Sequence, residues 1–113
     1  STDLSKFLID LISGYSGNGG ILKQKSYKEL YKPQLERSTF SESKNIGFNS
    51  GIFFELEGDY DEIGHTGGDP GTNIYMYFNT ETKKGRILIT NTDSQKENAG
   101  EVFSGIWNAI GEY

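Results

Sequence analysis

Cysteine is absent from this chain of 113 residues, and histidine, methionine and tryptophan occur once each. The absence of cysteine excludes disulfides, thiolate metal sites and a cysteine nucleophile. It leaves the cellular compartment open, because many secreted proteins also lack cysteine. The only imidazole in the chain is that of His65.

Basic residues are also few. The 11 lysines and arginines are outnumbered by 16 aspartates and glutamates, so the formal net charge is −5 and the pI is near 4.8. This balance argues against a nucleic-acid partner, because binding a phosphate backbone requires a concentrated basic surface. No apolar run approaches a transmembrane span, and no basic amphipathic stretch is typical of a membrane anchor. We therefore expect neither a nucleic-acid partner nor a membrane segment in this chain.

Glycine and tyrosine are abundant, with 15 and seven residues, as is typical of a turn-rich domain that contains strands. The length and the supply of large apolar residues predict a single domain over 1–113 with its own core. The chain starts at Ser1 without an initiator methionine or a signal peptide. From this start we expect a processed product or a cloned domain.

Helical periodicity predicts a helix near each end of the chain. The first apolar stripe consists of Leu4, Phe7, Leu8, Leu11 and Ile12. It predicts a helix over 3–13, ended by Gly14 and followed by a flexible glycine-rich link over 15–20. A wide apolar face predicts the last helix over 95–111. Gly100 and Gly105 interrupt this helix, and we expect them to permit a close approach of the helix to the sheet.

Two capping boxes are predicted at helix starts. Ser26 and Glu29 have the spacing of a cap for a short helix over 27–31, and Ser94 with Glu97 has the same spacing before the last helix. In such a box the serine accepts a hydrogen bond from a backbone N–H, and the glutamate reaches back to the cap residue. Both helices are therefore expected to start with a side-chain cap.

Between Asn45 and Asn91 the apolar period changes to two, which predicts strands. We expect four strands, at about 46–56, 60–66, 73–79 and 85–91, joined by short turns into an antiparallel meander. Three of these strands carry apolar or aromatic side chains on both faces, so both faces of the sheet should be at least partly covered. The predicted fold class is α+β, with an antiparallel sheet flanked by an N-terminal and a C-terminal helix.

In one stretch the order of the residues is more informative than the amino-acid composition. His65-Thr66-Gly67-Gly68-Asp69-Pro70-Gly71, followed by Tyr77-Phe78-Asn79 and Ile87-Leu88-Ile89-Thr90-Asn91, resembles the C-terminal part of the serine β-lactamase-like hydrolases. This group includes class C β-lactamases, D-alanyl-D-alanine carboxypeptidases and related esterases. The resemblance covers most of the chain, because 3–8 is also similar to the helix that precedes this region in the family. Within 64–79 we expect a strand ending near Thr66 and a turn over 67–71.

The resemblance implies a partial β-lactamase-like fold and a parent that hydrolyses β-lactams, D-alanyl-D-alanine peptides or esters. It implies a periplasmic or extracytoplasmic location for that parent, a small-molecule or peptide substrate, and neither a cofactor nor a metal. It also implies that the strand at Arg86–Asn91 lacks the neighbour that the family supplies from its N-terminal part. We therefore expect an open edge there, through which two copies of the chain form a homodimer.

The same resemblance assigns the site residues. His65 stands where the family has the lysine of Lys-Thr-Gly, which binds the substrate carboxylate, and imidazole suits this role because it donates a hydrogen bond and can carry charge near neutral pH. Thr66 offers its hydroxyl to the same substrate group, and Gly67 lets the substrate lie close to the strand. Gly68 supplies a backbone N–H to the oxyanion hole. Read without the resemblance, His65 is an exposed strand-end residue and the glycines only form a turn.

Two departures limit the catalytic interpretation. Ser41-Glu42-Ser43-Lys44 matches the Ser-x-x-Lys nucleophile motif, but no apolar helical periodicity follows it, so a chance match is favoured. The family's Tyr-x-Asn motif should precede His-Thr-Gly, whereas Tyr77-Phe78-Asn79 follows it. The chain therefore corresponds to one wall of an active site, inactive by itself.

Two alternatives remain open. The first is a non-catalytic binding or structural module that keeps a degenerate hydrolase fold. The second is a calcium site formed by Asp59, Asp61, Glu62 and Asp69, for which a solvated acidic hairpin is the favoured interpretation because the spacing fits no known calcium loop.

Overall fold

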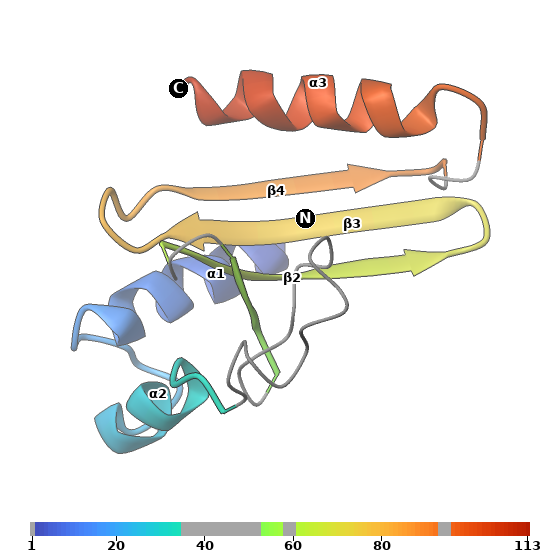
Figure 1. Cartoon of the computed structure of the whole chain (residues 1–113). Helices are drawn as coiled ribbons and strands as arrows, with labels where there is room; N and C mark the ends of the chain where they lie inside the picture. Colours follow the sequence, from blue (N-terminus) through green and yellow to red (C-terminus); the bar gives the residue numbers. More distant parts are fainter. Residues whose placement is uncertain (1, 35–52, 58–60, 93–95) are drawn as a thin grey trace.

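The computed structural model describes residues 2–34, 53–57, 61–92 and 96–113. In this part of the chain the elements are, in order, α1 (Thr2–Tyr15), α2 (Gln24–Leu30), β1 (Glu55–Glu57), β2 (Glu62–Asp69), β3 (Thr72–Asn79), β4 (Gly85–Thr90) and α3 (Ala99–Gly111). The strands form an antiparallel sheet in the order β1-β2-β3-β4. Helices α1 and α2 lie on one side of the sheet and α3 lies on the other (Figure 1). The predicted α+β meander is confirmed.

Alternation along the strands separates the core into two parts, one on each face of the sheet. The larger part joins α1 and α2 to the sheet and contains Leu8, Leu11, Tyr27, Tyr31, Phe54, Leu56, Ile63, Met76 and Phe78. The smaller part lies under α3 and contains Leu88, Ala99 and Phe103, with Tyr75 and Trp107 packed against them. On β3, Met76 and Phe78 therefore face α1, while Tyr75 and Tyr77, which alternate with them along the strand, face α3. The prediction that both faces of the sheet are covered is confirmed.

The turn between β2 and β3 is shorter than predicted. Residues 67–69 were expected in the turn, but they continue β2, and Asp69 pairs with Thr72 of β3. Only Pro70 and Gly71 form the connection. Gly71 has φ 84°, and proline followed by a glycine at positive φ is a combination common in type II turns. Glycine lacks a side chain but keeps its backbone N–H and C=O, so the ladder extends through the glycines.

The start of α2 differs from the predicted capping box. The cap residue is Lys23, without a side-chain capping bond, and Ser26 and Glu29 both lie inside the helix. The helix spans Gln24–Leu30, not 27–31, because it begins at the point where the main-chain N–H of Ser26 already donates to Lys23 O at 2.8 Å.

The start of α3, in contrast to that of α2, is later than predicted. The residue before the helix, Asn98, has φ 64° and makes no side-chain capping bond. A left-handed residue cannot belong to a right-handed helix, so α3 begins at Ala99 and not at 95. Ser94 lies outside the described residues. A Cβ added to Gly100 or Gly105 would meet nothing within 4 Å, so the expected close approach of helix to sheet at these two glycines is wrong.

The predicted first strand, 46–56, is described only near its end, where β1 covers Glu55–Glu57. The residues of that range through 52, and residues 58–60 that follow β1, lie outside the described residues. The strand predicted over 60–66 becomes β2, Glu62–Asp69. The two remaining predicted strands correspond to β3 and β4 with ends shifted by one residue.

The contact between α1 and α2 is organised by the ring of Tyr27, which is almost completely buried. A Cβ at Gly14 would lie 2.3 Å from this ring, and one at Gly19 would lie 2.4 Å from it. Gly14 does not end α1, which continues to Tyr15. Both glycines are needed because the tyrosine ring occupies the space that their side chains would fill.

Hydrogen bonds around the same tyrosine fix the glycine-rich link that was predicted to be flexible. The Tyr27 hydroxyl donates to the Asp10 carboxylate, whose Oδ1 accepts from Gly20 N at 2.7 Å. The hydroxyl also accepts from Ile21 N at 3.2 Å. The bond from Tyr27, helped by the Gly20 and Ile21 amides, lowers the pKa of Asp10 despite some desolvation. The end of the link that lies next to α2 is therefore hydrogen-bonded to Asp10 of α1.

Replacing Gly14 by alanine tests this packing. Gly14→Ala should lower the free energy of unfolding by about 1–3 kcal/mol, the usual cost of overpacking, although alanine favours helix. The control is Gly105→Ala, also inside a helix but with open space around its Cβ, which should raise the free energy by about 1 kcal/mol. Urea denaturation of both variants measures the difference, and an equal effect of the two substitutions contradicts the packing described.

Candidate functional site

The His-Thr-Gly stretch lies on a strand edge that is only partly covered. Strand β1 pairs with β2 at Glu62–Gly64, while β3 pairs with the whole length of β2. Within the described residues, the side of β2 away from β3 therefore has no strand partner over His65–Asp69. We call this segment the β2 edge. It lies next to the Pro70-Gly71 turn.

Backbone groups of alternate residues point toward this edge. The N–H of Thr66 is directed there, since it donates to Glu55 Oε1 of β1 at 3.4 Å. Backbone groups in a strand alternate between its two sides, so the N–H of Gly68 points in the same direction, whereas those of His65 and Gly67 point to β3. The β2 edge thus offers backbone hydrogen-bonding groups in the pattern that an added extended chain pairs with.

The side chains of His65 and Thr66 lie on opposite faces of β2. His65 shares a face with Met76, its cross-strand partner, and its ring stacks on Phe53 with centroids 4.5 Å apart. Its Nδ1 contacts the carbonyl oxygen of Thr66, and because a carbonyl only accepts, Nδ1 carries the hydrogen of this contact. Thr66 is on the other face, where its hydroxyl donates to Glu55 Oε1 at 2.9 Å. The two side chains flank the edge, so only a group lying at the edge itself is close to both.

The two glycines of the motif differ in their surroundings. A Cβ added to Gly67 would meet nothing within 4 Å, so the absence of a side chain there keeps the space beside the strand open. A Cβ added to Gly68 would lie 3.0 Å from Asn73 Oδ1. Asn73 is nine-tenths buried, and a side chain at position 68 would require it to shift.

Glu55 was not identified from the sequence, yet it holds two residues of the region together. Its carboxylate accepts hydrogen bonds from Thr66 through one oxygen and from the Tyr77 hydroxyl through the other. Tyr77 is buried, with its ring against Trp107. The one available signal was a carboxylate within the apolar run from Ile52 to Leu56, opposite Phe54 and Leu56.

The Tyr-x-Asn match downstream of the motif has structural roles. Tyr77 bonds to Glu55, and Phe78 belongs to the core on the other face. Asn79 Oδ1 accepts from the backbone N–H of Glu81 at 3.0 Å and of Thr82 at 2.8 Å, which stabilises the turn into β4. Ser41 and Lys44, the other motif match, lie outside the described residues.

The acidic residues around the β1–β2 connection do not form a metal site in the described part of the chain, where no three metal-binding side chains come together. Glu62 is bound through both carboxylate oxygens to Arg86 Nη2, each at 2.8 Å. Asp59 lies outside the described residues.

None of the helices that the structure describes has the length and apolar character needed to cross a membrane.

Comparison with known proteins adds one finding. A family model described as Beta-lactamase matches residues 1–108, which run from before α1 into α3. No curated protein and no solved structure gives a significant match.

Proposed function

Because the chain belongs to the β-lactamase family, we propose that it is the C-terminal part of a serine β-lactamase-related hydrolase acting on β-lactams, D-alanyl-D-alanine peptides or esters. The observation that carries the proposal is the β2 edge, which combines the His-Thr-Gly residues with a Gly68 N–H directed away from β3. In this proposal the substrate lies along the edge as an additional strand.

Each residue of the motif has a role at that edge. The backbone N–H of Gly68 donates to the oxyanion that develops on the carbonyl under attack, a task for which a rigid strand is suited because the donor needs no reorganisation. His65 and Thr66 approach the substrate carboxylate from the two faces of β2. Gly67 leaves room for the substrate beside the strand, consistent with the open space around its Cβ position.

The nucleophile is proposed to come from an upstream portion of the parent that carries Ser-x-x-Lys and Tyr-x-Asn. The Tyr77 and Asn79 side chains are engaged in structural bonds, so they do not stand in for that motif. The chain then contributes a wall of the active site and is inactive alone, because loss of a nucleophile and its base removes several orders of magnitude in rate.

A second candidate is a non-catalytic binding or structural module with a degenerate hydrolase fold. It is favoured by Glu55, which accepts the hydroxyl hydrogen of Thr66 at 2.9 Å. While that bond persists, Thr66 can accept a hydrogen bond from a ligand but cannot donate one.

Labelling with a fluorescent penicillin separates these candidates. The isolated chain should not be acylated, and the chain mixed with the upstream portion of its parent should be. His65→Ala should lower that reconstituted acylation about 10²-fold, the order observed when one preorganised electrostatic group is lost. The matched control is Glu81→Ala, at an exposed position in the turn between β3 and β4, which should leave the rate unchanged. Covalent labelling of Ser41 in the isolated chain, or full activity of His65→Ala, contradicts the proposal.

We also propose that the chain forms a homodimer through the outer edge of β4. Among the described strands only β3 pairs with β4, and Ile89 on β4 is 47% exposed. Pairing of two such edges across a two-fold axis extends the sheet and covers this side chain. Leu88 is a poor position for a test because it is buried under α3.

Sedimentation over a wide concentration range tests the dimer. Ile89→Lys should shift it toward monomer, because a charge on an edge strand opposes pairing, whereas Ile9→Lys, on α1 and 62% exposed, should not. A strictly monomeric wild-type chain rejects the dimer.

A further inference from the structure

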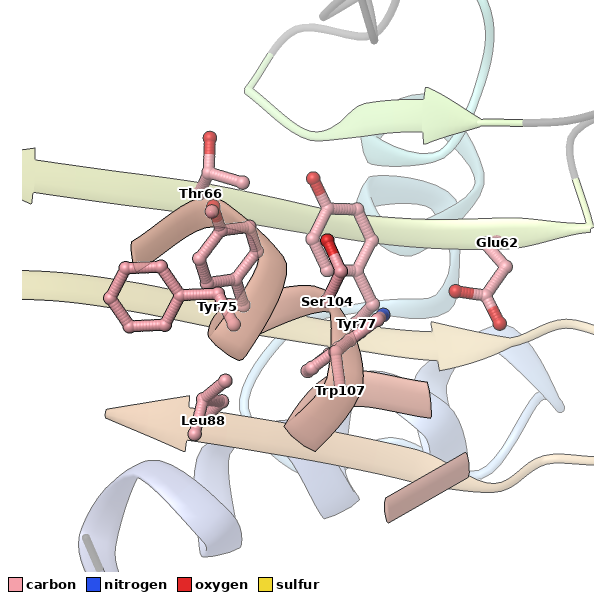
Figure 2. A pocket seen from close by; sticks show the side chains of 9 residues that line it. Glu62, Thr66, Tyr75, Tyr77, Leu88, Ser104 and Trp107 are labelled. Atoms are coloured by element: carbon pink, nitrogen blue, oxygen red, sulfur yellow. The ribbon is translucent and has the colours of Figure 1, made fainter. Parts of the chain in front are cut away.

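A cavity of about 310 Å³ lies between α3 and the face of the sheet opposite α1. Figure 2 shows the side chains that line it, which come from β2, β3, β4 and α3. Its volume is at the lower end of the range of small-molecule pockets, about 300–1,000 Å³, so it suits a molecule of one or two rings.

Two positions on α3 that carry no large side chain keep this space open. Gly100 and Ser104 are four residues apart, so they share one face of the helix, and both line the cavity. A Cβ at Gly100 would meet no atom within 4 Å. Phe103 and Trp107 separate the helix from the sheet. Their ring centroids lie 6.4 and 5.8 Å from that of Tyr75.

The walls are aromatic. Tyr75 and Tyr77 from β3 and Phe103 and Trp107 from α3 contribute four rings, arranged at tilted and edge-on angles. Such rings bind flat apolar molecules through stacked and edge-to-face contacts. A planar ligand therefore gains contact with several walls at once.

The lining residues carry the hydroxyls of Thr66, Tyr75, Tyr77 and Ser104, the indole N–H of Trp107 and the carboxylate of Glu62. Glu62 is the one charged residue among them. The nearby cation, Arg86, is engaged by Glu62 on both carboxylate oxygens and stacks over Trp107 at 4.3 Å. An anionic ligand would meet the Glu62 carboxylate without an uncommitted cation among the residues that line the cavity.

We propose that this cavity binds a small, neutral, planar aromatic molecule that carries an N–H or O–H donor. The rings hold its faces, and the hydroxyls or the carboxylate accept its hydrogen. The cavity shares Thr66 with the proposed substrate site, but its other lining residues lie outside the β2 edge, so ligand binding there can be measured without any hydrolase activity.

Trp107 makes the test direct, because it is the only tryptophan in the chain and lines the cavity. Unlabelled indole is titrated into the ¹⁵N-labelled chain while the Trp107 side-chain N–H resonance is recorded. The expected result is a saturable shift with a Kd below about 1 mM, within the limit for a ligand of this size. Indole-2-carboxylate, which adds a negative charge, and 1-methylindole, which lacks the donor, should each bind at least about tenfold more weakly.

Two matched variants locate the binding. Gly100→Leu fills the cavity and should abolish the saturable shift, whereas Gly105→Leu, on the same helix with equally open surroundings but outside the cavity lining, should leave the Kd unchanged. Thermal melting checks that both are folded, and Ser104→Leu replaces Gly100→Leu if the latter is not. The proposal is overturned if indole gives no saturable shift up to its solubility limit, or if the folded filling variant binds it as the wild type does.

Discussion

The pairing of β2 with β3 is the constraint on which the rest of the molecule depends. The two-residue turn at Pro70-Gly71 sets this register, and eight residue pairs follow from it. A shift of one residue would exchange the two faces of a strand. Met76 would then leave the core under α1, and the Gly68 N–H would point into the sheet. One turn therefore fixes both the double-sided core and the direction of the groups at the β2 edge.

Much of the fold could be predicted from local patterns, because alternation in the strands and the helical stripes are carried by neighbouring residues. The starts of the helices could not be predicted in this way. Tyr27 anchors the link before α2, and the left-handed backbone of Asn98 makes α3 begin later in the sequence. The turn was placed too early because glycine favours turns but does not prevent pairing. Glu55 was missed for a different reason: its partners lie 11 and 22 residues away, and only the sheet brings them together.

The glycines of this chain serve separate purposes, which composition alone does not reveal. Gly14 accommodates the ring of Tyr27, and Gly71 adopts positive φ in the turn. Gly67 and Gly100 have open space at the Cβ position, one beside the β2 edge and the other at the cavity under α3. Thr66 connects these two regions, since its backbone belongs to the edge and its side chain lines the cavity. Both proposed binding regions thus include a glycine whose missing side chain leaves space open.

In the proposed function the β2 edge is available to a substrate at alternate backbone positions. Amide hydrogen exchange over 65–69, followed residue by residue by NMR on the intact chain, tests this most directly. The N–H of Gly68 is expected to exchange at least about tenfold faster than those of His65 and Gly67, which are bonded to β3. Equal protection of Gly68 and Gly67 would show that another part of the chain occupies the edge, and would contradict the claim.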